Sequence, residues 1–284
     1  MKKPDWLRIP VTKDPNQGVV AGILKKLNLN TVCHEAACPN RMECFSRKTA
    51  TFMILGASCT RNCGFCNVRH DTPQAVDADE PRRIAQAVAE LGMRYIVITS
   101  VTRDDLPDGG AAHFAETIRE IRKTSPDTAV EVLIPDFQGD VSSLETVADA
   151  FPAVISHNME TVAALYPTVR PQAIYRRSLD LLRNIKRLNP AIHSKSGFML
   201  GLGETEAQVL ELLDDLHAAN CDFLTIGQYL APSSAHLPIR EFIEPAVFDA
   251  YGETARQKGF AFVASAPFVR SSYHAGEALE PAYK

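Results

Sequence analysis

The chain has 284 residues, of which 45% are hydrophobic and 23% charged, and its formal net charge is −4. This length suits one large α/β domain with short appendages, and the charge balance gives no reason to expect a nucleic acid or a membrane as partner. Residues 1–6 (MKKPDW) lack the apolar core of a signal peptide, and no run approaches the roughly 18 apolar residues of a membrane span. We therefore expect a cytoplasmic location, with an organelle reached after processing as the alternative, and a monomer.

Residues 1–50 are expected to form an extension that precedes the repeating part of the chain. The extension has a Pro-rich start, a short helical stretch around Val19–Leu27, and three cysteines with the spacing Cys33-x4-Cys38-x5-Cys44. Six of the seven cysteines of the chain lie between residues 33 and 66. Because thiols stay reduced in an unexported chain, such clustering indicates metal binding rather than disulfides.

From residue 51 onward, apolar runs of strand length alternate with longer amphipathic stretches. The predicted strands are Thr51–Gly56, Tyr95–Val101, Ala129–Pro135, Ala153–His157, Ser196–Leu200 and Phe223–Gln228, with Phe260–Ala264 as a possible seventh. The predicted helices between them are Pro81–Leu91, Ala112–Lys123, Val141–Ala150, Tyr175–Leu188 and Glu206–Ala219. In the last helix, Val209, Leu212 and Leu216 recur at a spacing that indicates one buried face.

This alternation predicts a parallel sheet in an α/β fold, and about six strand–helix units favour a partial (β/α)6-type TIM barrel; a doubly wound sheet is the alternative. The expected domains are the cysteine-bearing extension over residues 1–50, the barrel over residues 51–265, and a C-terminal tail over residues 266–284 with the motif Arg270-Ser271-Ser272-Tyr273. Chemistry in such barrels gathers at the carboxyl ends of the strands, where the loop after the first predicted strand lies.

That loop carries a second cysteine triplet, Cys59-x3-Cys63-x2-Cys66. A [4Fe–4S] cube normally takes four thiolates, so three cysteines leave one iron open to another ligand. The spacing, with Phe65 before the last cysteine, resembles the radical S-adenosylmethionine signature, in which the amino and carboxylate groups of S-adenosylmethionine chelate the open iron. A zinc site with His70 as fourth ligand is the alternative, although structural zinc sites favour two-residue separations between paired cysteines.

The first triplet likewise supplies three ligands and requires a fourth. His34, Glu35 and Glu43 are nearby candidates, and a residue far away in the sequence is the favoured alternative. Because it precedes another cluster motif in the sequence, the first triplet indicates a second iron–sulfur cluster.

Further segments make a family resemblance specific. They are CHEAACPN at residues 33–40, ATFMILG at 50–56, VTRDDLPDGG at 101–110, HNMETV at 157–162, YPTVRP at 166–171 and RSSYHA at 270–275. With both triplets, these segments resemble the lipoyl synthase family across residues 33–275. His34 stands where an acidic residue is expected and Phe45 where Trp is expected, and residues 57–58 also vary, but none of these is a ligand that the resemblance implies.

The resemblance implies an enzyme that inserts two sulfur atoms at C6 and C8 of an octanoyl group on a lysine of a carrier domain. It implies two [4Fe–4S] clusters and S-adenosylmethionine as cofactors. The implied ligands are Cys59, Cys63 and Cys66 for the reducing cluster, and Cys33, Cys38, Cys44 and Ser272 for an auxiliary cluster that supplies sulfur. Because thiolate suits iron–sulfur clusters better than oxygen does, the corner at Ser272 is expected to be the weak one.

The resemblance also implies partners. These are octanoylated lipoyl carrier domains (glycine-cleavage H protein or 2-oxoacid dehydrogenase E2), a low-potential electron donor (flavodoxin or ferredoxin), and an iron–sulfur carrier that rebuilds the auxiliary cluster. Candidates for docking an acidic carrier domain are Arg41, Arg47, Lys48 and Arg61. The alternatives in function are another two-cluster radical S-adenosylmethionine enzyme of sulfur transfer and an iron–sulfur carrier or electron-transfer protein.

Polar residues at or after predicted strand ends are candidates for binding S-adenosylmethionine. They are Ser100, Asn158, Glu160 and Arg170, the last suited to the carboxylate of the cofactor. The turn at residues 201–204 (GLGE) permits close backbone approach through its glycines. Arg103, Asp104 and Asp105 are expected to have an unassigned substrate or cofactor role, the role of His157 stays open, and Cys221 is expected to be a buried, inert thiol.

Overall fold

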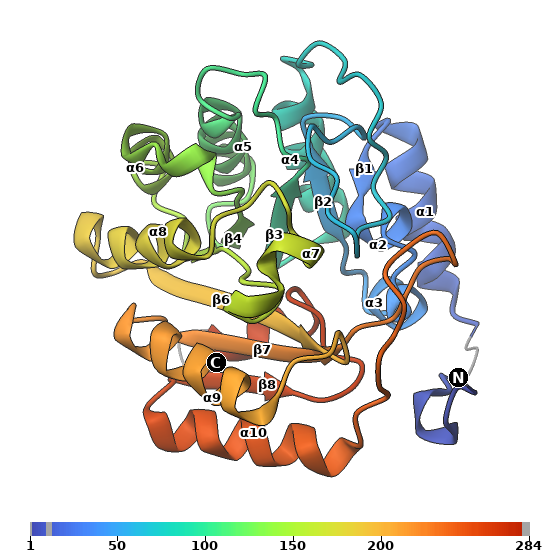
Figure 1. Ribbon diagram of the computed structural model, residues 1–284. Helices are drawn as coiled ribbons and strands as arrows, with labels where there is room; N and C mark the ends of the chain where they lie inside the picture. The colour runs from blue at the N-terminus through green and yellow to red at the C-terminus, as the bar shows by residue number, and fades with distance from the viewer. Residues whose placement is uncertain (1, 10–12, 280–284) are drawn as a thin grey trace. The chain divides into compact units, whose positions relative to one another are not determined.

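The computed structural model describes residues 2–9 and 13–279, which form an α/β protein of alternating strands and helices (Figure 1). They divide into two compact units. The N-terminal unit comprises the described residues within Val11–Arg61 and Asn67–Ile155, and the C-terminal unit those within Met1–Pro10, Asn62–Cys66 and Ser156–Lys284. The strand order is sequential from β1 to β8, as in a partial (β/α) barrel, so the predicted fold class is confirmed.

The N-terminal unit is built on a largely parallel sheet. Its strands are β1 (Asn30–Thr31), β2 (Thr51–Ile54), β3 (Tyr95–Ser100) and β4 (Ala129–Leu133). Its helices are α1 (Pro15–Lys26), α2 (Val32–Glu35), α3 (Arg41–Ser46), α4 (Glu80–Leu91), α5 (Ala111–Thr124), α6 (Val141–Ala148) and the 3₁₀ turn η2 (Phe137–Gly139). Phe52 pairs with Ile98 and Ile98 with Val132, and all three are fully buried, so this row forms part of the core between sheet and helices.

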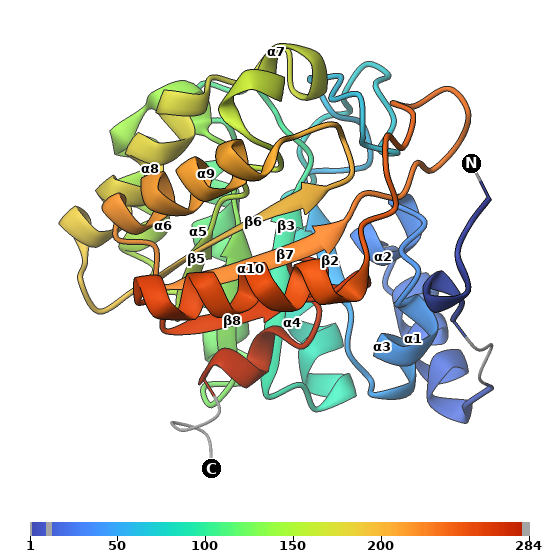
Figure 2. The same cartoon turned by 60° about the horizontal axis from the view of Figure 1, so that its bottom comes forward.

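The C-terminal unit continues the strand–helix alternation. Its strands are β6 (His193–Leu200), β7 (Phe223–Gln228) and β8 (Phe262–Ser265), paired in parallel, while β5 (Val154–Ser156) spans the boundary of the two units. Its helices are α7 (Tyr166–Val169), α8 (Tyr175–Leu188), α9 (Glu206–Ala218) and α10 (Pro245–Lys258), with 3₁₀ turns η1 (Asp5–Leu7), η3 (Ala163–Leu165) and η4 (Ala275–Leu279). Figure 2 shows α10 lying along β7 and β8.

Several elements differ from the prediction, and three of them are informative. The short strand β1 pairs with β2 in antiparallel orientation and was not expected. Strand β6 begins three residues before Ser196, because the polar residues Ser194 and Lys195 are buried strand residues here. Helix α10 was missed; it begins at Pro245 and ends before Gly259, whose φ of 103° suits the left-handed position after a helix.

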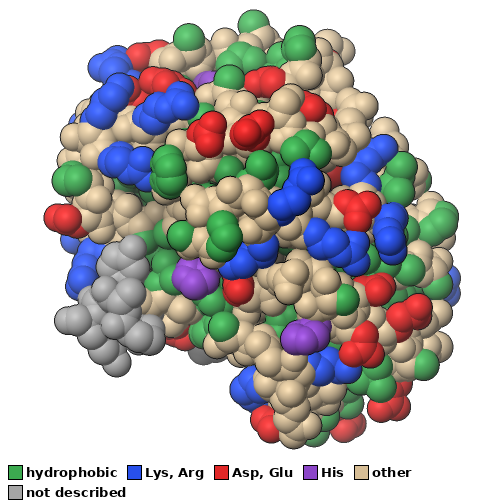
Figure 3. Space-filling model, turned by 90° about the vertical axis from the view of Figure 1, so that its left-hand side faces the viewer, with side chains coloured by type: hydrophobic (Ala, Val, Ile, Leu, Met, Phe, Trp, Pro, Cys, Tyr) green, Lys and Arg blue, Asp and Glu red, His purple; other side chains and the backbone are tan. Residues whose placement is uncertain are grey.

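The surface shown in one view carries charged side chains of both signs. On the face shown in Figure 3, Lys and Arg side chains are interspersed with Asp and Glu. Within the described parts of the chain, every helix falls short of the length and hydrophobicity that a membrane span requires.

Candidate active site

The first cysteine triplet is assembled on two short helices of the N-terminal unit. Cys33 lies in α2 and Cys44 in α3, and the Cys38 amide donates a hydrogen bond to the Cys33 carbonyl over 3.2 Å. Helix α3 is fastened to α1, since the Gln17 side chain donates to the Met42 carbonyl over 3.0 Å. The part of the extension from α1 to α3 is therefore folded within the N-terminal unit.

The thiols of this triplet influence one another electrostatically. Burial raises the pKa of the Cys33 thiol, and repulsion from Cys38 adds to that effect. Burial, followed by repulsion from Cys33 and Cys38, raises the pKa of Cys44 to about 12. Because the pKa values of these thiols are raised, they become thiolates only when a cationic centre binds them. The iron ions of an iron–sulfur cluster are such a centre, so this donor set fits a cluster.

Among the described residues, no group of three His, Cys, Asp or Glu side chains is close enough to hold one metal ion. In a [4Fe–4S] cube each thiolate binds a different iron, so the sulfur atoms stand further apart than the ligands of one ion.

The second triplet is divided between the two units, with Cys59 in the N-terminal unit. The Cys59 amide donates to the Arg69 carbonyl over 2.8 Å. The Cys59 sulfur accepts hydrogen bonds from the backbone amides of Arg61, over 3.4 Å, and Thr102, over 3.3 Å. The loop after β3 therefore holds this sulfur in place.

Cys63 and Cys66 belong to the C-terminal unit, where the segment between them is fixed by backbone hydrogen bonds. The Gly64 amide donates to the Val169 carbonyl, and the Leu237 amide donates to the Gly64 carbonyl, both over 3.0 Å. His236 Nε2 lies 3.2 Å from the Cys66 carbonyl oxygen.

Phe65, the aromatic residue of the signature, anchors the same segment. It packs against a buried cluster of Val169, Leu202 and Tyr229. An aromatic side chain at this position therefore fixes the backbone between the two cysteines.

Asn158 and Glu160 lie just beyond β5 and are joined to each other. The Asn158 amide group donates to Glu160 Oε1 over 3.0 Å. Glu160 has φ of 65°, an unusual conformation for a non-glycine residue, and it is held there by backbone hydrogen bonds with Gly197 and Met199. Burial raises the pKa of the Glu160 carboxyl, and the guanidinium groups of Arg170 and Arg270 oppose that effect. Because burial disfavours the charged form of this carboxyl group, the carboxylate suits a ligand with a cationic group such as an ammonium.

The Arg170 side chain forms hydrogen bonds within the protein. Its Nη1 donates to the carbonyls of Asn158, over 2.8 Å, and Met159, over 3.2 Å, and to the hydroxyl of Tyr166, over 3.2 Å. The side chain therefore shapes the turn that presents Asn158, and its contact with a cofactor carboxylate stays a prediction.

Both units contain buried hydroxyl groups that lack a hydrogen-bond partner in the described part of the chain, at or near strand ends. The Oγ atom of Ser100, the last residue of β3, has no hydrogen-bond partner among the described residues, and the same holds for Ser156 at the end of β5 and for Thr161. Because buried hydroxyls usually find a partner, these atoms fit a polar ligand. Sequence reasoning missed Ser156 and Thr161, whose residue types carry no distinctive signal.

The Arg270–Tyr273 motif reaches the same region of the C-terminal unit through its first serine. The Ser271 hydroxyl donates to Asn158 Oδ1 over 2.9 Å. Sequence reasoning singled out Ser272 and missed Ser271. Ser272 is partly buried and belongs to a different unit from the first triplet, so its assignment as the fourth ligand stays a prediction.

The charged segment Arg103–Asp105 is not a solvated loop. Arg103 is buried and pairs with Asp105 over 2.8 Å, which lowers the pKa of the Asp105 carboxyl. Asp104 holds Arg61, whose side chain is only 5% exposed. The predicted docking role of Arg61 is therefore wrong, because a buried and doubly paired guanidinium is not available to a partner protein.

Two further residues have structural roles. His157 is buried and its Nε2 lies 2.9 Å from the Ser178 hydroxyl. Cys221 is buried as expected, and burial raises the pKa of its thiol.

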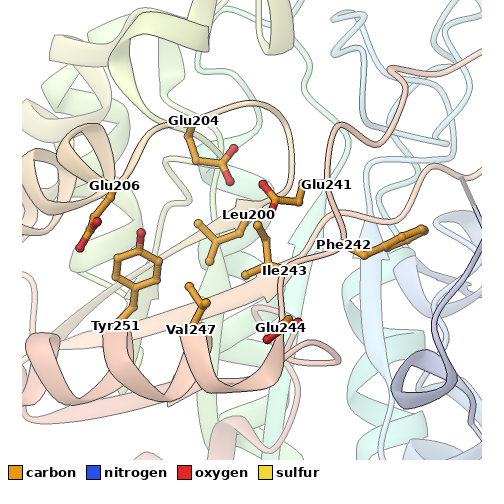
Figure 4. Close-up of a pocket in the computed structure, with 9 residues that line it drawn as sticks. All are labelled: Leu200, Glu204, Glu206, Glu241, Phe242, Ile243, Glu244, Val247 and Tyr251. Carbon is orange, nitrogen blue, oxygen red and sulfur yellow. The ribbon is translucent and has the colours of Figure 1, made fainter.

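The C-terminal unit also contains an acidic pocket of about 380 Å³ (Figure 4). It is lined by Leu200, Glu204, Glu206, Glu241, Phe242, Ile243, Glu244, Val247 and Tyr251. Glu204 uses both carboxylate oxygens to accept from the amides of Gly201, over 2.6 Å, and Leu202, over 3.0 Å. Glu204, from the turn predicted at residues 201–204, therefore caps the backbone of that turn. The cysteines of both triplets and the candidates Ser100, Asn158, Glu160 and Arg170 are not among the residues that line this pocket.

Solved structures show the fold to which the chain is similar. Methylornithine synthase aligns with a TM-score of 0.58 at 12% identity, covering 89% of this chain and 72% of that one. The Streptococcus suis SuiB structure bound to S-adenosylmethionine aligns with a TM-score of 0.59 at 14% identity, covering 87% and 60%. At such low identity the likeness supports the fold alone.

Sequence comparison is far more specific. The model of the radical SAM superfamily matches residues 53–216. The lipoyl synthase of Alkaliphilus metalliredigens is 56% identical over 98% of this chain and 96% of its own length. The lipoyl synthase of Caldanaerobacter subterraneus subsp. tengcongensis is 53% identical over 98% of each. Membership of the superfamily brings S-adenosylmethionine and a [4Fe–4S] cluster as cofactors. The chain therefore belongs to the lipoyl synthase family of the radical SAM superfamily.

Proposed function

We propose that the chain inserts two sulfur atoms at C6 and C8 of an octanoyl group that is carried on a lysine of a lipoyl carrier domain. The observation that carries this proposal is the 56% identity to a lipoyl synthase over nearly the full length of both chains. Both cysteine triplets lie within the matched length. When bound, the cofactors supply radical hydrogen abstraction and sulfur, chemistry that no acid or base of the protein can perform on an alkyl C–H bond.

In this proposal the second triplet holds the cluster that reduces S-adenosylmethionine. Cys59, Cys63 and Cys66 bind three irons, and the fourth iron stays open to the cofactor. The Glu160 carboxylate, oriented by Asn158, suits the cofactor's ammonium group. The buried Ser100 hydroxyl suits a polar group of the same ligand.

The first triplet and Ser272 hold an auxiliary [4Fe–4S] cluster that supplies the inserted sulfur. The support is the shared electrostatic environment of Cys33, Cys38 and Cys44. A serine oxygen is a weaker ligand to iron in such a cluster than a thiolate, which makes that corner the one from which iron leaves. Replacing Ser272 with Cys tests this role: an unchanged rate of insertion of both sulfurs would show that oxygen ligation is unimportant.

The proposal also names the partners and location of the enzyme. The substrate is an octanoylated H protein or E2 domain, electrons come from a flavodoxin or ferredoxin, and an iron–sulfur carrier rebuilds the auxiliary cluster. A cytoplasmic location and a monomeric state complete the proposal.

Anaerobic reconstitution followed by assay of an octanoyl-lysine peptide tests the function. We expect about eight irons per chain, as two [4Fe–4S] clusters require. With dithionite and S-adenosylmethionine, mass spectrometry should show a peptide that has gained two sulfur atoms. Replacing Cys221 with Ala is the matched control, because this cysteine lies outside both triplets and should leave the product unchanged. Four irons per chain, or a peptide that stays octanoylated, would contradict the proposal.

A further inference from the structure

We propose that Arg61, clamped by Asp104 and Asp136, is a positioning residue that fixes two backbone hydrogen bonds to the Cys59 sulfur and thereby raises the reduction potential of the cluster. This inference rests on the proposed role of Cys59 as a cluster ligand. All of the residues that it uses belong to the N-terminal unit.

The clamp consists of three short hydrogen bonds in a buried setting. Arg61 Nε and Nη2 donate to the two carboxylate oxygens of Asp104 over 2.7 and 2.9 Å. Nη2 also donates to Asp136 Oδ1 over 2.6 Å, and the Asp136 side chain is fully buried. Paired bidentate contacts of this kind leave a guanidinium little freedom to rotate, so the backbone at Arg61 is held in one place.

The backbone on both sides of the clamp is tied together as well. The amide and the hydroxyl of Thr60 both donate to the Thr102 carbonyl over 3.0 Å. The Asp104 amide donates in turn to the Thr60 hydroxyl over 3.0 Å. Residues 59–61 and 102–104 therefore form one rigid pair of segments, although more than 40 residues separate them in the sequence.

This pair of segments brings two N–H groups to the Cys59 sulfur. The donors are the amides of Arg61 and Thr102, at 3.4 and 3.3 Å. Hydrogen bonds to a ligating sulfur stabilise the more negative, reduced state of an iron–sulfur cluster. The clamp therefore favours uptake of the electron that the reaction needs.

The neighbouring pair Arg103–Asp105 provides a matched control. Arg103 is as deeply buried as Arg61, and its Nε and Nη2 also donate to one aspartate, Asp105. Its Nη1 donates to the Leu55 carbonyl over 3.3 Å, not to the segment 59–61. Substitution in either pair should lower the stability of the fold. Only substitution in the clamp on Arg61 should change the reduction potential of the cluster.

The experiment compares Arg61→Lys and Asp104→Asn with Arg103→Lys and Asp105→Asn in the reconstituted full chain. Redox titration is monitored by electron paramagnetic resonance of the reduced cluster, identified as the signal that changes when S-adenosylmethionine is added. We expect the reduction equilibrium of both clamp variants to fall roughly fivefold, the effect of losing one hydrogen bond to the sulfur. Both control variants should match the parent protein.

The outcomes separate this inference from the proposed function. If the electron paramagnetic resonance signal of the parent protein does not change when S-adenosylmethionine is added, the proposed function itself is contradicted. A normal parent with unchanged clamp variants, or with control variants shifted equally, would overturn the inference alone. If Arg61→Lys does not fold, as judged by circular dichroism, Asp104→Asn decides, because it keeps the side-chain shape and removes only the charge.

Discussion

The two cysteine triplets are built by different means. The first lies within one compact unit, where the short helices α2 and α3 present Cys33 and Cys44 and α3 is fastened to α1. The second lies in a loop whose halves belong to different units, and each half is fixed by hydrogen bonds from loops distant in sequence. In the proposed function the first triplet holds the sulfur source and the second holds the cluster that reduces S-adenosylmethionine, so substitutions at the two sites should have different effects.

The largest effects are expected when one cysteine of either triplet is replaced, and the two triplets should differ in which reaction is lost. Replacing Cys59 with Ala should abolish both cleavage of S-adenosylmethionine and sulfur insertion. Replacing Cys33 with Ala should abolish sulfur insertion and leave cleavage in place, because the reducing cluster keeps its ligands. Chromatography of 5′-deoxyadenosine and mass spectrometry of the peptide measure both reactions. Loss of cleavage in the Cys33 variant would show that the two sites are not separable.

A smaller effect is expected from filling the space beside Gly64. A Cβ atom there would lie 2.9 Å from Cγ of Leu237, so either the segment between Cys63 and Cys66 or the Leu237 side chain must shift. We expect Gly64→Ala to lower the rate of product formation about 100-fold, as misplacement by about 1 Å can do. The double variant with Leu237→Ala should recover part of that loss.

Gly22→Ala is the matched control for that variant. Gly22 lies in α1, and a Cβ atom there has nothing within 4 Å. Its substitution should leave the rate unchanged and stabilise the fold by about 0.5–1 kcal/mol, which thermal unfolding measures. A Gly64→Ala variant as active as this control would show that the loop is not tightly held.

A further prediction concerns Glu160. Replacing it with Gln keeps its hydrogen-bonding shape but removes the charge, so affinity for S-adenosylmethionine should fall about 10-fold, the effect of one charge-assisted hydrogen bond. Equilibrium binding to the reconstituted protein measures this. Glu253→Gln serves as control, since Glu253 is paired on the surface with Arg256. Equal affinity in both variants would remove Glu160 from the cofactor site.

The smallest expected effect concerns docking of the carrier. Arg47 and Lys48 follow α3 and have exposed side chains, and Arg47 pairs only loosely with Glu43 at 3.4 Å. Reversing both charges should raise the KM for an octanoylated carrier domain by about threefold, because exposed charges contribute about 1 kcal/mol or less. The KM for a short octanoyl peptide should stay the same. An unchanged KM for the carrier would end the docking hypothesis.

Cysteine spacing identified both triplets because ligand sets of this kind are local in sequence. The hydrogen bonds that hold the ligands are not local. The Cys59 sulfur is reached by the Thr102 amide, and Asn158 by the Ser271 hydroxyl, from 43 and 113 residues away. Only the folded chain shows such pairs, which is why the clamp on Arg61 went unpredicted.

The fold was predicted best where the apolar pattern is strong. Strand β7 has the predicted bounds, and all its residues are buried. Helix α10 was missed because it buries only Phe248, Gly252 and Ala255, too few apolar residues for a clear stripe. The start of β6 was hidden because Ser194, a polar residue, is buried through a hydrogen bond from its hydroxyl to the Asn220 carbonyl.

Isotope labelling tests the division of labour between the triplets most directly. The chain is reconstituted with heavy-isotope sulfide, freed of excess sulfide, and given an octanoyl-lysine peptide, dithionite and S-adenosylmethionine for one turnover. The account predicts a product with two heavy sulfur atoms in the parent protein, and none in the Cys33→Ala variant despite cleavage of S-adenosylmethionine. A product with unlabelled sulfur, or a labelled product from the Cys33→Ala variant, would contradict the claim that the first triplet holds the sulfur source.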